Sequence, residues 1–181
     1  MRVYQVHINL EYYTILHNQE GNEIMQYRMR KFQLTMEQMD ELLHRANTGR
    51  FATINENGYP YVIAMHFVYY NNKIYMHGLP KGQKIDNINR DSKVCFEVDE
   101  LFGLLTDNIE NACDTEAEYN SVVITGNASL LEDLDLKREV LNKLVEKYTP
   151  QFTGKELPDN MIKGTAVIEI DIVECTGKYH K

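Results

Sequence analysis

The sequence has no apolar run of the ~20 residues that a membrane-spanning helix needs. Cysteine is also scarce: Cys95, Cys113 and Cys175 are odd in number and lack metal-ligand spacing. A disulfide scaffold is therefore not expected, and because no signal peptide is recognisable, the cysteines fit a reducing cytoplasm. Basic residues are outnumbered, 19 against 27 acidic, and the net charge of −8 disfavours general binding to nucleic acid or anionic lipid.

Two motifs of common cofactor and metal sites are missing as well. No G-x-G-x-x-G follows an expected strand, which disfavours a resident Rossmann dinucleotide site. No His-x-x-x-His pair occurs on an expected helix, so we expect no bound metal. What remains is a chain of 181 residues, 43% hydrophobic. That is enough for one globular domain that buries about two-thirds of its unfolded surface.

The N-terminal segment has the pattern of an added strand. Residues 2–16 alternate between apolar and polar side chains, which is the period of a half-buried strand, and a turn follows at 18–22. We interpret residues 1–26 as an N-terminal strand or hairpin extension to a domain of residues 27–181. Its apolar edge is suited to pairing with a partner subunit.

The rest of the chain alternates strand-like and helix-like segments. A capping box at 35–38 begins one expected helix, a short helix is expected near 83–89, and a longer one at 134–148 ends before Pro150. Six strands are expected, at 51–54, 59–70, 73–77, 94–98, 121–131 and 166–176. A long acidic loop is expected at 101–118, and Gly126 marks a bulge. This order predicts a mainly β, α+β fold in which an antiparallel sheet forms a small closed or partly split barrel.

The junction between the third strand and the short helix is suited to a phosphate. It reads His77-Gly78-Leu79-Pro80-Lys81-Gly82-Gln83-Lys84. Glycines let the backbone approach a ligand, the first amides of a helix are unpaired donors, and lysines add positive charge. A solvated surface turn can have the same composition, so the octapeptide by itself leaves both readings open.

Several motifs recur in the order found in one family. They are Gly49-Arg50-Phe51-Ala52-Thr53, Gly58-Tyr59-Pro60-Tyr61-Val62, Phe67-Val68-Tyr69, Ile74-Tyr75-Met76-His77-Gly78, Gly82-x-Lys84, Tyr119-x-Ser121-Val122-Val123-x-x-Gly126 and Thr176-Gly177-Lys178. With them, residues 27–178 resemble the FMN-binding split-barrel proteins related to pyridoxamine 5′-phosphate oxidase, in particular the nitroimidazole-resistance (NimA-like) branch. The resemblance implies a six-stranded antiparallel Greek-key split barrel of the FMN-binding type.

The resemblance also implies a homodimer with two FMN sites at the subunit interface. The implied cofactor-binding residues form three groups along the chain: Met65, His66 and Phe67; His77, Gly78, Lys81 and Lys84; Asn120, Ser121 and Val122. The first group would lie along the flavin ring with its backbone. The second would reach the ribityl and phosphate groups, and the third would approach the flavin from the other subunit.

These observations favour an FMN-dependent oxidoreductase that uses NADH or NADPH to reduce a small electron-poor acceptor such as a nitroimidazole. His77, beside the phosphate turn, is the expected catalytic residue, while His66 is the weaker candidate. The Arg/His-rich C-terminal motif of true pyridoxamine-phosphate oxidases is missing, which disfavours that activity. Two alternatives stay open: a flavin-binding or flavin-sensing protein with little turnover, and a split barrel that binds haem.

Overall fold

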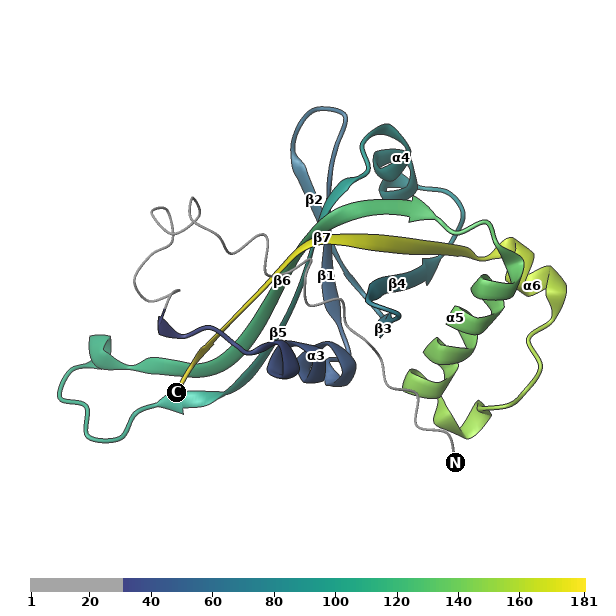
Figure 1. Ribbon diagram of the computed structural model, residues 1–181. Coiled ribbons are helices and arrows are strands. Elements are labelled where there is room, and N and C mark those ends of the chain that lie inside the picture. Colours follow the sequence, from purple (N-terminus) through teal and green to yellow (C-terminus); the bar gives the residue numbers. More distant parts are fainter. Residues whose placement is uncertain (1–30) are drawn as a thin grey trace. The chain divides into compact units, whose positions relative to one another are not determined.

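The computed structural model describes residues 31–181, in which Gln33–Lys181 forms one compact unit (Figure 1). The predicted strand or hairpin at 1–26 lies outside the described residues. In the described part of the chain, the predicted α+β fold is confirmed: one antiparallel sheet is accompanied by helices inserted between its strands.

The sheet has seven strands in the order β2-β1-β5-β6-β7-β4-β3. Their bounds are β1 (Gly49–Ile54), β2 (Pro60–Met65), β3 (Phe67–Tyr70), β4 (Lys73–Gly78), β5 (Lys93–Leu105), β6 (Glu116–Leu130) and β7 (Ala166–His180). The helices are α3 (Met36–Arg45), α4 (Gln83–Arg90), α5 (Leu134–Tyr148) and α6 (Asp159–Gly164), with short 3-10 turns η2 (Ala112–Asp114) and η3 (Pro150–Phe152).

The two edge strands of the sheet, β2 and β3, are separated in the sequence by His66 alone. The sheet must therefore curl until its edges meet at that residue, which gives a barrel that is split between β2 and β3. Phe51, Phe67 and Phe96 are fully buried inside it, and the rings of Phe67 and Phe96 pack edge to face at 4.9 Å. Such aromatic packing contributes both apolar burial and a preferred geometry to the core.

The helix α5 covers the outer face of β3, β4 and β7 with a second, smaller core. Val140 and Leu144 of α5 are buried there against Val68, Tyr75 and Val167 of the strands. Because side chains alternate between the two faces of a strand, the residues of β3 and β4 divide between this outer core and the barrel interior. Figure 1 shows α5 running alongside this side of the sheet.

Local signals in the sequence correctly marked several ends and turns. Thr35 caps α3 in a full capping box with Gln38. Asn71 and Asn72, both with positive φ, connect β3 and β4 as a two-residue hairpin turn. The pairing of β6 with β7 shifts register between Thr125 and Gly126, where a Cβ on Gly126 would lie 2.4 Å from the Asp171 carbonyl oxygen. The expected bulge at Gly126 is therefore confirmed, and the close backbone approach explains why glycine stands there.

One predicted strand is two strands, which raises the count from six to seven. The expected strand at 59–70 breaks at His66 into β2 and β3. Apolar residues continue through the break, so the sequence pattern does not show it. The side chain of Tyr148 from α5 bonds to the backbone on the far side of the break, a contact across 81 residues that no local pattern contains.

The predicted loop at 101–118 is wrong. β5 continues to Leu105 and β6 begins at Glu116, so that only a short segment with η2 connects them. Beyond the barrel these strands form a projecting arm with β7 (Figure 1), where Leu101, Phe102 and Leu104 are all exposed. Strands exposed on both faces need no apolar alternation, which is why the arm lacked a strand-like period. For the same reason β7 extends beyond the expected end at 176.

The connection between α5 and β7 contains η3 and the short helix α6. In residues 31–181, no helix has the length and apolar character required to cross a membrane.

Candidate functional site

The hairpin of β3 and β4 places the two predicted histidines on the same side of the sheet. Phe67 pairs with Met76, so His66 falls opposite His77 just before β3 begins. By alternation His77 shares the face of Tyr75, which is the face that α5 covers. Burial lowers the pKa of His77 below its ordinary value, and the neighbouring His66 lowers it further. His77 is therefore mainly neutral at pH 7 and can accept a hydrogen bond or a proton.

The predicted phosphate turn brings Lys84 back to the end of β4. A Cβ built on Gly78 would lie 3.2 Å from both Cε and Nζ of Lys84, so the amine lies directly over the glycine. Gly82, with φ of 110°, is the N-cap of α4, and no described side chain caps the helix. Its carbonyl accepts from the amides of Ile85 and Asp86. The earlier amides of the first turn and the Lys84 amine thus form a positive site.

Gly78 separates this positive site from the histidines. Neighbouring residues of a strand point to opposite faces, so His77 projects towards α5 while Lys84 stands over the other face at Gly78. A larger residue at position 78 would fill the space that the lysine occupies. A ligand that passes over the end of β4 could contact both groups, because the glycine leaves the backbone open between them. Lys81 is exposed in the same turn.

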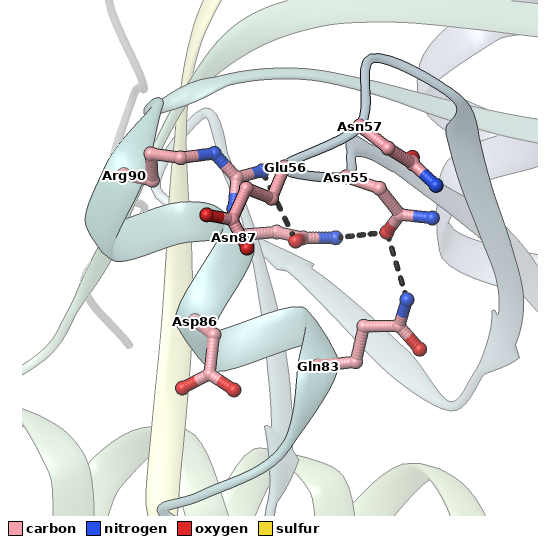
Figure 2. Close-up of a pocket in the computed structure, with 7 residues that line it drawn as sticks. All are labelled: Asn55, Glu56, Asn57, Gln83, Asp86, Asn87 and Arg90. Atoms are coloured by element: carbon pink, nitrogen blue, oxygen red, sulfur yellow. Dashed lines mark hydrogen bonds between the residues drawn. The ribbon is translucent and has the colours of Figure 1, made fainter.

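A network of polar side chains holds α4 against the β1–β2 turn (Figure 2). Nδ2 of the buried Asn87 donates to Thr53 Oγ1 at 2.8 Å and to Asn55 Oδ1 at 2.9 Å. Asn55 Oδ1 also accepts from Gln83 Nε2 at 2.9 Å, and Arg90 donates to Asn87 Oδ1 at 3.1 Å. The network borders an open hollow of about 460 Å³ that includes none of the predicted cofactor-binding residues. Its polar groups satisfy one another, so its role is to fix the direction of α4 and of the phosphate turn.

The three residues of the first predicted group, Met65, His66 and Phe67, differ in how far a ligand could reach them. Met65 is half-buried at the end of β2 and His66 is exposed. The ring of Phe67 lies in the barrel core, so only its backbone could contact a ligand. That backbone is already engaged, because its N–H donates to Tyr148 Oη at 2.9 Å and its carbonyl oxygen lies 2.9 Å from the same atom.

The third predicted group lies on β6, three strands across the sheet from the first group: Ala64 pairs with Arg50, Arg50 with Glu97 and Glu97 with Val123. Val122 pairs with Gly177 of β7, whereas His77 pairs with Val167 of the same strand. Ten residues along a strand span roughly 33 Å. Ser121 and Val122 are also buried. Within one chain, the third group therefore lies ten or more residues along β7 from His77, but only three strands across the sheet from the first group.

Arg50, another residue of the matched motifs, lies on β1 and pairs with two acids of β5. Its guanidinium donates to Glu97 at 2.9 Å and also to Asp99. The two carboxylates raise the pKa of Arg50, Asp99 first and Glu97 second. This charge is balanced within the sheet, and the arrangement favours a structural role for Arg50.

Sequence reasoning missed two residues at the C-terminal end of α5. The ring of Tyr148 stacks on the ring of His66 with centroids 4.2 Å apart and planes 19° from parallel. Nζ of Lys147 is buried without a hydrogen-bond partner, 4.0 Å from the centroid of the Phe67 ring. Burial lowers the pKa of Lys147 to about 8. In the sequence, Tyr148 falls on the apolar face of the expected helix and Lys147 has the pattern of a solvent-exposed charge. No local sequence signal therefore identifies either residue as part of the site.

Comparison with solved structures gives the fold independent support. The chain is similar to a candidate 5-nitroimidazole antibiotic resistance protein from Bacteroides thetaiotaomicron (TM-score 0.67, 23% identity, covering 81% of this chain and 85% of that one). It is also similar to the flavocytochrome Anf3 from Azotobacter vinelandii (TM-score 0.76, 21% identity, covering 89% of this chain and 75% of that one). A third similar structure is the FAD and haem binding protein from Mycobacterium smegmatis (TM-score 0.73, 17% identity, covering 81% of this chain and 72% of that one). Identities this low establish a shared fold.

A search of curated proteins gave no match. The family model described as pyridoxamine 5′-phosphate oxidase matches residues 35–179, which include both histidines, the phosphate turn and the buried segment of β6. Over that length the split barrel, the strand break at His66 and the turn into α4 are all present, and the chain belongs to the pyridoxamine 5′-phosphate oxidase family.

Proposed function

We propose that this protein is an FMN-dependent oxidoreductase that takes electrons from NADH or NADPH and passes them to a small electron-poor acceptor, such as a nitroimidazole. One observation carries the proposal: the Lys84 amine lies over Gly78 at the uncapped start of α4. Family membership and the flavoproteins among the similar structures support it.

The residues at the end of β4 fit a phosphorylated, planar cofactor. Lys84 and the first-turn amides of α4 would hold the phosphate, because a lysine charge and backbone amides together suit a dianion. The exposed edge of β2, where Val62 is 56% accessible, offers an apolar strip of the kind that a flavin ring packs against. When bound, the flavin supplies the electron transfer itself.

The chain's own residues would orient the reactants and handle a proton. The lowered pKa of His77 leaves Nδ1 or Nε2 free to accept a hydrogen bond at pH 7. After protonation from solvent, the same nitrogen can give a proton to a reduced acceptor. The imidazole is solvent-accessible near the end of β4, so a bound ligand that excluded water from it would lower its pKa further.

A second copy of the chain would complete the site. In this proposal Asn120, Ser121 and Val122, whose partners on β7 lie ten or more residues from that of His77, approach the flavin from the other subunit. Exposed apolar side chains on the sheet and arm, including Val123 and Val173, offer a surface for such an interface. We therefore propose a homodimer with flavin sites at the interface.

The phosphate contact can be tested by comparing FMN with riboflavin. Lys84→Ala should weaken FMN by roughly 10-fold or more and riboflavin much less, since a charge-assisted contact contributes about 1.5–3 kcal/mol. Lys163→Ala, at an exposed lysine of α6 that belongs to none of the predicted cofactor-binding groups, is the control. Fluorescence titration of both flavins gives the dissociation constants, and an equal loss for the two would place Lys84 away from the phosphate.

Binding without turnover is the second candidate. The adjacent His66 and His77 and the haem-binding protein among the similar structures favour a planar ligand that is held but not necessarily reduced. The absorbance spectrum of the purified protein distinguishes flavin from haem. Reduction of bound FMN by NADH or NADPH then distinguishes an enzyme from a binding protein; if neither nicotinamide reduces it, the oxidoreductase proposal with this donor fails.

A further inference from the structure

The last turn of α5 meets the barrel at the split between β2 and β3. Tyr148 Oη lies 3.0 Å from the carbonyl oxygen of Asn47, which leads into β1. It also lies 2.9 Å from both the amide nitrogen and the carbonyl oxygen of Phe67, the first residue of β3. One hydroxyl thus contacts backbone on both sides of the split.

The Phe67 backbone needs such a partner. Tyr70 and Lys73 flank the two-residue turn of the hairpin, so by alternation the Phe67–Met76 pair directs its backbone groups away from β4. Among residues 31–181, β3 is an edge strand, and no other strand of this part of the chain pairs with its free side. The Tyr148 hydroxyl accepts from the Phe67 N–H, and its single proton goes to the carbonyl oxygen of Phe67 or of Asn47. The position of the strand break thus depends on this hydroxyl.

The ring of the same tyrosine sets the plane of His66. The two rings are stacked with centroids 4.2 Å apart and planes 19° from parallel, and His66 directly precedes β3, whose first residue pairs with Met76 beside His77. Tyr148 is itself half-buried, and burial is the larger of two opposing effects that together raise its pKa. It therefore stays a neutral hydrogen-bonding phenol across the physiological range.

We infer that Tyr148 is a positioning residue for the proposed flavin site. Its hydroxyl holds the break that ends β2, and its ring orients His66 towards His77. This inference rests on the proposed function and on the family resemblance, which implies that the Met65–Phe67 segment lies along the flavin ring. Tyr148 touches neither reactant; it acts through the backbone of Phe67 and through the imidazole of His66.

The test compares Tyr148→Phe with Tyr70→Phe in the full-length protein. Tyr70 Oη donates to Glu139 of α5 at 2.5 Å, so the control also removes a hydroxyl between the sheet and the same helix. Both variants should lower the unfolding midpoint slightly. Only Tyr148→Phe should raise the dissociation constant for FMN about 10-fold and change the visible circular dichroism of the bound flavin, because only it frees the Phe67 backbone.

A Tyr148→Phe protein with wild-type FMN affinity and an unchanged flavin spectrum would overturn the inference and leave the proposed function intact. Failure of the wild-type protein to bind any flavin would instead refute the proposed function. In that case the NMR signal of the His66 ring still decides on positioning. The stacked Tyr148 ring changes the chemical shift of the His66 ring protons. Tyr148→Phe should alter this chemical shift if the hydroxyl holds the two rings in place. An unaltered chemical shift would show that the hydroxyl does not orient His66.

Discussion

Replacing Lys147 by methionine should stabilise the protein. Its Nζ is buried, has no hydrogen-bond partner and faces the ring of Phe67. Methionine keeps a flexible chain of similar length in this space and removes the charge. A buried amine without an acid nearby is a rare arrangement, because removing an ammonium from water is unfavourable unless a partner compensates it.

Two opposing effects determine how much Lys147→Met should change the free energy of unfolding. Burial lowers the pKa of Lys147 from 10.5 to about 8, and this shift of about 2.5 units corresponds to about 3.4 kcal/mol at 1.36 kcal/mol per unit. Contact of the ammonium with the Phe67 ring returns about 0.5–2 kcal/mol, and movement of the long side chain towards water reduces the penalty further. We expect Lys147→Met to raise the free energy of unfolding by about 1–3 kcal/mol at pH 7.

The stability of the wild-type protein should depend on pH through Lys147. Between the folded pKa near 8 and the ordinary value of 10.5, the unfolded chain binds more protons at Lys147 than the folded protein does. Wild-type stability should therefore gain a contribution as pH rises through this window and lose it as pH falls through 8. The advantage of Lys147→Met over the wild type should shrink over the same range, because the amine is then neutral in both states.

Urea unfolding at a series of pH values from 7 to 10 measures both effects. The matched control is Lys143→Met, one turn earlier on α5, where the amine is paired with Glu146 at 2.9 Å and its pKa is raised. This variant should change stability by less than about 0.5 kcal/mol. The reasoning is refuted if Lys147→Met destabilises the protein at pH 7, or if its difference from the wild type does not change with pH.

Two further predictions concern the core and the site. Gly49→Ala should destabilise the protein by about 1–3 kcal/mol, because the new Cβ would lie 2.0 Å from Cζ of the buried Phe96. Gly103→Ala, at a glycine with open space around it, is the control, and thermal unfolding measures the stability of both variants. If His77 gives a proton to the acceptor, flavin reoxidation should slow as pH rises through a value below 6.5, and His77→Gln should remove this dependence. Stopped-flow absorbance follows the step, and a pH profile shared by both proteins would exclude His77 as the acid.

Local sequence signals were sufficient for much of the fold. The capping box at Thr35, the Asn71-Asn72 turn and the glycine at position 126 each depend on backbone geometry within a few residues, and each is present as expected. Gly78 and Lys84, which the sequence pattern singled out, do come together at the turn into α4, and their binding of a phosphate stays a prediction. The strand segments that are exposed on both faces could not be predicted, because no buried face imposes an alternation of apolar and polar residues on them.

Most of the helices and strands, the family resemblance and the residue types at the end of β4 can be read from the amino-acid sequence. The tertiary structure alone decided that the strand breaks at His66, that Tyr148 holds the break, and that an unpaired amine of Lys147 lies against Phe67. It also separated Asn120–Val122 from His77. These features come from contacts between residues about 80 positions apart or from strand register, and a one-dimensional pattern contains neither distance nor burial.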